Sequence, residues 1–120
     1  MNLSQIIKTL VSEIKLTEIQ AKIFLHVVIN GKMNTSEISN DLKISLDDAT
    51  QNSKKLVELG GFIDMPNDEF EAMHPRFTAV NMYRKMCERE QKEFKKNLHV
   101  DNIGVALETS YDDARTKYNK

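Results

Sequence analysis

Apolar side chains near the start of the chain recur at the three- and four-residue spacings that are typical of helices. The first run predicts a helix with one apolar face, formed by Leu3, Ile6, Ile7, Leu10, Val11 and Ile14. A second helix is expected after it, because Thr17 and Gln20 have the spacing of a capping box and "NG" at residues 30–31 is a helix stop. Its apolar positions are Ile19, Ile23, Phe24, Val27 and Val28. The first helix therefore needs a partner surface.

Two shorter helices are predicted next. Thr35 begins "TSEIS" and is expected to cap a helix that has Ile38 and Leu42 as apolar anchors. After a short link, Ser45 is expected to cap a helix over residues 45–59. The inward positions of that helix are spaced four, three and four apart, at Ala49, Ser53, Leu56 and Gly60. Two short helices in this order predict a helix-turn-helix.

A β-hairpin is expected after these helices. Residues 60–65 and 69–75 are predicted as strands, and "PND" at residues 66–68 as the turn between them. A helix-turn-helix that is followed by a hairpin is a winged helix. The predicted fold class is therefore mainly α with a small β-hairpin, and residues 1–80 are expected to form a winged helix-turn-helix domain.

Residues 81–120 are predicted to form a C-terminal helical extension. A long polar helix is expected from about Ala79 to Leu98, with a narrow apolar stripe at Tyr83, Met86, Cys87, Phe94 and Leu98. A stripe this narrow favours a partner helix, so the extension is expected to join two copies in a homodimer. A last helix is predicted from apolar positions near a helical period, although Gly104 weakens this pattern. The positions are Val100, Ile103, Leu107, Tyr111, Ala114 and Tyr118. As the alternative to a homodimer, the C-terminal tyrosines pack on the first helix of the same chain.

The segment "LTEIQAKIFLHVVINGKMNTSEIS", residues 16–39, resembles the entry to the winged-helix domain of the TrmB-like archaeal transcription regulators. The shared features are, in order, Leu16-Thr17-Glu18, Ala21-Lys22, Phe24-Leu25, Gly31 and Thr35-Ser36-Glu37-Ile38. "GGFI" and the strand end "RFTAV" at residues 76–80 are similar to that family's wing and its junction with the next helix. The resemblance covers roughly residues 10 to 85, and it implies a winged helix that binds double-stranded DNA and regulates transcription.

The sequence departs from that family in two respects. The family's recognition helix usually opens with basic and small polar residues, whereas this one opens with Leu46-Asp47-Asp48. The best-known members also have a large C-terminal sugar-binding domain, and we expect no such domain in a chain of 120 residues. The resemblance therefore does not imply sugar sensing.

The helix over residues 45–59 carries the predicted readers of DNA. On a helical wheel, Thr50, Gln51 and Lys54 lie opposite the inward positions, where Gln suits adenine and Lys reaches phosphate or guanine. Phosphate contacts are expected from backbone amides at a helix start and from cations. The whole predicted DNA-binding set is Thr35, Ser36, Lys43, Ser45, Thr50, Gln51, Lys54, Lys55 and Arg76. An ordinary solvated helix surface is the alternative.

Acidic residues around this helix suggest a second interpretation. Asp47 and Asp48 suit the positive end of a helix dipole, and Asp48 is placed to close a capping box with Ser45. They can instead accept a hydrogen bond from cytosine or contact a basic protein. Residues 1–80 hold 8 basic and 11 acidic residues, and the predicted wing tip has no Lys or Arg. The rival hypothesis is therefore a protein-interaction adaptor with an acidic recognition surface.

Composition narrows the possible functions. At 120 residues, with 40% hydrophobic residues, four Gly and two Pro, the chain is expected to be one helical unit with a real core. Apolar runs stay well short of the roughly 20 residues that span a bilayer, so we expect a cytoplasmic protein without membrane contact. His26, His74 and His99 have no ligand spacing to a Cys or carboxylate, and Cys87 is a single cysteine. No metal, cofactor or enzymatic activity is expected.

Overall fold

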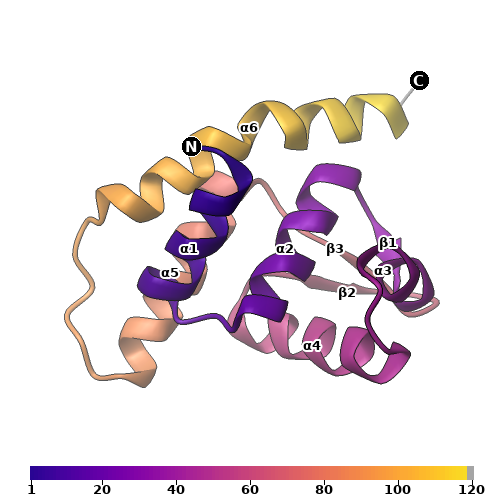
Figure 1. Cartoon of the computed structure of the whole chain (residues 1–120). Helices are drawn as coiled ribbons and strands as arrows, with labels where there is room; N and C mark the ends of the chain where they lie inside the picture. The colour runs from indigo at the N-terminus through magenta and orange to yellow at the C-terminus, as the bar shows by residue number, and fades with distance from the viewer. Residues whose placement is uncertain (119–120) are drawn as a thin grey trace.

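The computed structural model describes the backbone of residues 1–118 and the side chains of residues 1–116. This part of the chain is mainly helical and has one small antiparallel sheet (Figure 1), which confirms the broad fold class. Its elements in order are α1 (Leu3–Ile14), α2 (Glu18–Asn30), β1 (Met33–Asn34), α3 (Thr35–Leu42), α4 (Leu46–Leu59), β2 (Ile63–Met65), β3 (Glu69–Glu71), α5 (Pro75–Arg89) and α6 (Leu98–Tyr118).

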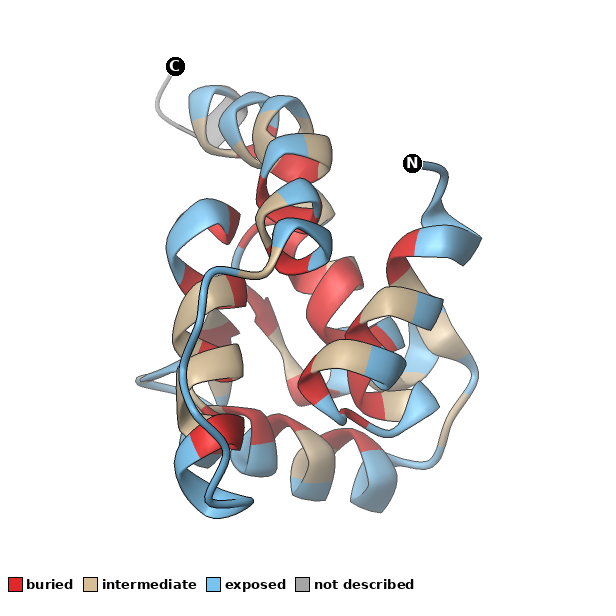
Figure 2. Cartoon of the chain, turned by 90° about the vertical axis from the view of Figure 1, so that its left-hand side faces the viewer, coloured by how far each residue is buried: buried red, intermediate tan, exposed pale blue. Residues whose placement is uncertain are grey.

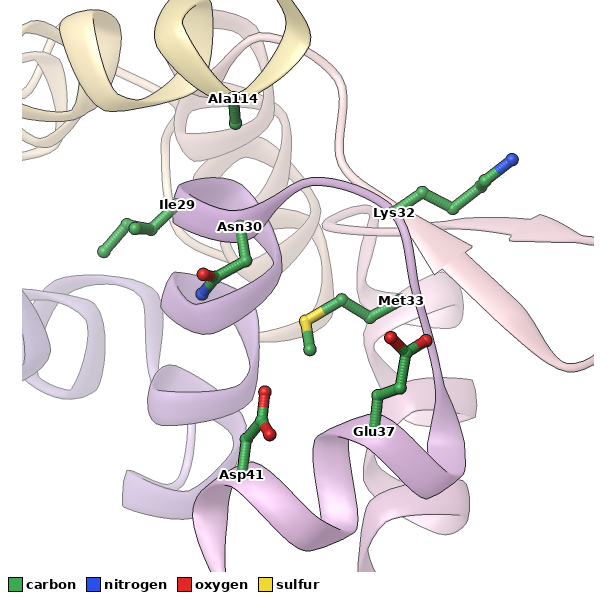
Figure 3. Close-up of a pocket in the computed structure, with 7 residues that line it drawn as sticks. All are labelled: Ile29, Asn30, Lys32, Met33, Glu37, Asp41 and Ala114. Atoms are coloured by element: carbon green, nitrogen blue, oxygen red, sulfur yellow. The ribbon is translucent and has the colours of Figure 1, made fainter. Parts of the chain in front are cut away.

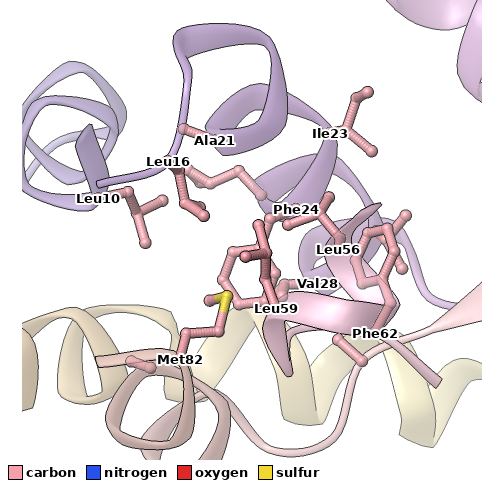
Figure 4. Close-up of a cluster of buried hydrophobic side chains, with 14 of the residues drawn as sticks. Leu10, Leu16, Ala21, Ile23, Phe24, Val28, Leu56, Leu59, Phe62 and Met82 are labelled. Carbon is pink, nitrogen blue, oxygen red and sulfur yellow. The ribbon is translucent and has the colours of Figure 1, made fainter. Parts of the chain in front are cut away.

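Helix α2 lies at the centre, and α1, α3, α4, α6 and β3 all pack on it. Its residues Ile23, Phe24, Val27 and Val28 are fully buried, as the predicted apolar face required. The Phe24 ring stacks on Phe62 with 6.1 Å between the ring centroids, and this pair lies within the main apolar cluster (Figure 4). The buried positions of the helices face the interior of the molecule (Figure 2), and every helix contributes to one apolar cluster, so one core holds the described chain together.

The cap positions of the first helices follow from short polar side chains. The predicted capping box of Thr17 and Gln20 at the start of α2 is confirmed, with both reciprocal hydrogen bonds formed. The predicted cap of α3 is wrong by one residue, because the Asn34 side chain accepts the amide hydrogen bond from Glu37 at 2.8 Å. Asn is a stronger cap than Thr, and Thr35 becomes the first helical residue with its side chain packed inward.

The sheet has the order β1-β3-β2. The predicted hairpin forms, but its strands are shorter than the predicted residues 60–65 and 69–75, and the sheet gains a third strand. Met33 pairs with Phe70 and Asn34 with Glu69, in a strand of two residues that has too little pattern to be recognised in the sequence. At the turn, Asn67 and Asp68 take φ angles of 66° and 57°. Asn and Asp tolerate these left-handed angles, which the chain adopts in the three-residue turn between Met65 and Glu69.

Helix α5 differs from the helix that was predicted over about Ala79 to Leu98. It begins at Pro75, so residues 76–80 are helical and their assignment to a strand is wrong. Pro75 has the fixed φ of a first helical residue, and His74 Nδ1 accepts the Arg76 amide at 3.1 Å. The helix ends at Arg89 because Gln91 adopts a φ of 55° and Lys92 N donates to Cys87 O at 2.8 Å. This is a Schellman stop, which separates α5 from α6.

Helix α6 confirms the last predicted helix, although Tyr118's side chain and residues 119–120 lie outside the described part. Val100, Ile103, Leu107 and Ala114 are buried on one face. Gly104, which weakened the prediction, has a packing role: a Cβ added to it would lie 2.6 Å from the Arg76 Cα. Only glycine allows the start of α5 to approach α6 this closely.

Candidate nucleic-acid interface

Helix α4 is held in place by its cap and by its inward face. Ser45 Oγ accepts the Asp48 amide at 3.0 Å, so the predicted cap is confirmed. The predicted capping box is wrong, because only this one of its two hydrogen bonds forms and the Asp48 carboxylate does not return to the Ser45 amide. Ala49, Ser53 and Leu56 are all fully buried, as their spacing predicted.

The turn between α3 and α4 fixes the angle at which α4 leaves α3. Lys43 takes a left-handed conformation with φ of 56° and ends α3. Ile44 N donates to Ser39 O at 3.1 Å, and Ser39 Oγ donates back to Ile44 O at 2.6 Å. Two reciprocal hydrogen bonds therefore tie the turn to the last turn of α3, and α4 projects from a rigid base.

The outward face of α4 is covered by no other described element (Figure 1). Gln51 and Lys54 are exposed, and Thr50 is half-buried at the edge of the face. Lys54 has no carboxylate within ion-pair distance among the residues whose side chains are described, whereas Lys55 pairs with Glu58 at 3.2 Å. The three predicted readers therefore lie on one helix, and Lys54 can take a new partner without giving up an ion pair to another described side chain.

Other members of the predicted DNA-binding set are spread more widely. Lys43 and Ser45 are exposed beside the start of α4, and Ser36 is exposed in the first turn of α3. Thr35 is only 8% exposed and its amide already donates to Asp68 O, so it has little left to offer a phosphate. Arg76 lies in the first turn of α5, where it donates to Glu108 of α6 at 3.0 Å.

Arg76 therefore does not join the face of α4. The start of α5 lies against α6, on the opposite side of the molecule from α4 (Figure 1). The sequence predicts this residue in a strand end at the base of the hairpin. Because residues 75–89 are helical instead, the guanidinium points to a neighbouring helix.

The hairpin turn lies beside the start of α3 and is acidic. Asp68 O accepts the Thr35 amide at 3.3 Å, so the turn and the first turn of α3 are joined. The turn itself carries Asn67 and Asp68 and no cation, while Lys32 lies 3.9 Å from Glu69 on the adjoining strands. A phosphate of a DNA backbone near this turn would meet amides and Lys32, because the tip of the hairpin carries no arginine.

The fold buries part of the predicted dimerisation stripe and leaves another part exposed. Met86 and Cys87 are 2% and 1% exposed, because they pack inside the same chain, so the expectation that they line an open stripe is wrong. Tyr83 is half-buried and its ring lies 6.0 Å from that of Phe94. Phe94 and Leu98 are 49% and 65% exposed and lie after the end of α5. Only these last two remain fully available to a second copy.

A pocket of about 460 Å³ lies between the end of α2, β1, α3 and α6 (Figure 3). Its polar lining includes Glu37 and Asp41, one turn apart on α3. Glu37 accepts the Asn34 amide at 3.0 Å, and Asp41 lies 2.9 Å from His26 Nε2. Both carboxylates already have partners within the fold, so the pocket has a structural explanation.

The fold also brings together three residues that sequence spacing did not connect. His74, Glu108 and Asp112 each offer a ligand atom, and these atoms all lie within 4.8 Å of one another. His74 precedes α5 and the two carboxylates are on α6, more than 30 residues later in the chain. No local motif could reveal this cluster, because it depends on how α5 and α6 pack.

Comparison of the chain with protein-family models, with curated proteins and with solved structures gives no match. None of the helices in the described residues combines the length and the apolar character that a bilayer crossing requires.

Proposed function

We propose that this chain is a DNA-binding transcription regulator, a winged helix of the TrmB-like type that inserts α4 into the major groove as a homodimer. Thr50 and Gln51 would contact base edges, and Lys54 a phosphate or a guanine. The hairpin of β2 and β3 is the wing in this proposal, and α3 supports the recognition helix. The protein would act in the cytoplasm, without a cofactor or an enzymatic step.

The observation that carries the proposal is the state of α4's outward face. A helix that only supports a fold needs an inward face, and α4 has one in Ala49, Ser53 and Leu56. Opposite them, Gln51 and Lys54 are exposed on a helix that projects from a rigid turn. A major groove is roughly 12 Å wide and accepts one helix of this kind.

Acidic residues set the expected strength of binding. Asp47 and Asp48 are exposed at the start of α4, where they interact with the helix dipole and face any approaching phosphate. Lys43, Lys54 and Lys55 are the cations nearest to them in sequence, and Lys55 already pairs with Glu58. With so few cations, we expect weak binding by one copy that falls steeply with salt, and a footprint that doubles in a dimer.

A titration of fluorescent duplexes tests the proposal. A pool of random-sequence duplexes is titrated with the full chain at low and at moderate salt, and bound duplexes are selected and sequenced. We expect binding at low salt and enrichment of a short sequence, with an inverted repeat if two copies bind. Absence of binding at low salt would contradict the proposal.

One observation favours a second function, a protein-interaction adaptor. Asp47 and Asp48 are exposed, and no cation lies within ion-pair distance of either within the part of the chain whose side chains are described. Together with the acidic hairpin turn they present carboxylates that suit a basic protein partner. In that case, substituting both by Asn weakens a partner complex by more than it lowers the melting temperature, whereas the same change strengthens DNA binding if the first proposal holds.

A further inference from the structure

We propose that His74, Glu108 and Asp112 form a binding site for one divalent transition metal ion of the zinc type. The three side chains come from the segment before α5 and from one face of α6. His74 Nε2 lies 3.7 Å from Glu108 Oε1, and the ligand atoms of all three lie within 4.8 Å of one another. A small inward movement of each would bring them to the roughly 2.0–2.2 Å at which nitrogen and oxygen ligands hold zinc.

Packing between α5 and α6 positions the three groups. Glu108 and Asp112 are four residues apart, which places both carboxylates on the same face of α6. Gly104, one turn before them, lets the start of α5 lie against α6, and this brings His74 over that face. The Tyr111 ring lies 5.0 Å from the imidazole and restricts its rotation. The site is therefore built on one face of α6 and on the residue that caps α5.

The ligand set decides which ion would bind. One imidazole nitrogen and two carboxylate oxygens suit zinc and its neighbours among the divalent transition metals. Calcium and magnesium prefer oxygen ligands alone, so the imidazole selects against them. Three protein ligands also leave a fourth position open to water or to a further ligand, as in zinc sites that are not purely structural.

Two contacts of the cluster residues compete with an ion. His74 Nδ1 accepts the Arg76 amide at 3.1 Å, so the proton of the neutral ring is on Nε2, the atom that would bind the metal. Metal binding moves that proton to Nδ1 and breaks the cap hydrogen bond, which should lower the affinity by about fivefold. The Arg76 guanidinium also donates to Glu108 Oε2 at 3.0 Å, and this exposed pair is weak enough to open.

Because of these competing contacts, Arg76 should have a predictable effect on the affinity for the metal ion. Its guanidinium neutralises Glu108 and holds one carboxylate oxygen away from the ion. Removing that charge should therefore strengthen metal binding, while removing any of the three ligands should weaken it. An ion held here would join the segment that follows β3 to α6, and so couple the base of the hairpin to the C-terminal helix.

Calorimetric titration of zinc chloride into the full chain, in a buffer that does not bind metals, tests the proposal. We expect one zinc ion per chain, and no heat of binding from calcium or magnesium chloride. His74→Asn is the most informative variant, because Asn retains the helix cap but not the imidazole. We expect this variant, Glu108→Gln and Asp112→Asn each to bind zinc at least tenfold more weakly.

His99→Asn is the matched control, because His99 is exposed in the first turn of α6 and is not part of the cluster. It should bind zinc as the unmodified chain does. Arg76→Gln should bind zinc more tightly, a gain that partial unfolding cannot produce. The proposal is overturned if zinc gives no saturable binding, or if folded His74→Asn and Glu108→Gln retain the original affinity.

Discussion

Helices α4 and α5 both carry apolar residues at helical spacing, yet the fold uses their surfaces in opposite ways. Helix α4 buries the inward positions that its pattern predicted and leaves its polar face uncovered. Helix α5 buries Met86 and Cys87, which were expected to face a second copy of the chain. A periodic stripe therefore shows that a helix needs a partner surface, but not whether the same chain supplies it.

The partner of α5 is α6, which packs along it after a connection over residues 90–97. The sequence signal for this partner is weak because Gly104 interrupts its apolar period. In the fold that glycine is the point of closest approach between the two helices. What weakened the predicted helix is thus the feature that lets α6 pack closely against the start of α5.

The largest expected effect is a difference in stability between variants at two residues of the predicted stripe. Met86→Ala removes a side chain that is 2% exposed, and we expect a loss of about 2–5 kcal/mol in the free energy of unfolding. Phe94→Ala removes a larger side chain that is half exposed, and should cost less than about 1 kcal/mol. Denaturant titration measures both, and similar small losses would show that Met86 is not a core residue.

The contact between α5 and α6 is tested by a smaller change. In Gly104→Ala the new methyl group meets the backbone of Arg76, so we expect a loss of about 1–3 kcal/mol although Ala favours helices. Val105→Ala is the control, since Val105 is exposed on the same helix and should change stability by no more than about 0.5 kcal/mol. A stabilised Gly104→Ala variant would rule out the close approach.

The cap at the start of α4 should contribute less to the free energy of unfolding than either packing contact does. Ser45→Ala removes the acceptor for the Asp48 amide, and we expect a loss of about 1 kcal/mol in thermal or denaturant unfolding. Ser12→Ala provides the comparison, because Ser12 is exposed within α1 and caps no helix. If both changes were neutral, Ser45 would not be the cap that orients this helix.

Changes at the remaining exposed stripe should hardly affect folding at all. We expect Phe94→Ser together with Leu98→Ser to leave the free energy of unfolding of the monomer nearly unchanged, since both side chains are largely exposed. If a second copy covers them, light scattering should show a dimer that the double variant converts to a monomer. A dimer that persists in the variant would place the interface elsewhere.

Much of the fold could be predicted from local signals. Helices α1, α2 and α4 have clear apolar periods and side-chain caps, and they begin and end close to the predicted residues. The misses come from weaker or longer-range causes. Strand β1 has two residues, and the break after Arg89 depends on Gln91 adopting a left-handed conformation that its residue type does not favour.

For the candidate site too, local patterns predict some positions, and others depend on tertiary packing. Thr50, Gln51 and Lys54 share one face because they lie on one helix, and a helical wheel is enough to place them. Arg76 was misplaced because its position depends on where α5 begins and on which helix it contacts. The cluster of His74 with two α6 carboxylates had no sequence signal, since only tertiary packing brings it together.

The most direct test of the central claim, that α4 presents a DNA-binding face, is the salt dependence of DNA affinity. Lys54→Ala should make the negative slope of log K against log salt shallower by about one, because one phosphate contact is lost. Lys8→Ala, a change of equal charge on an exposed position of α1, should leave the slope unchanged. Equal slopes for the unmodified chain and both variants would contradict the claim.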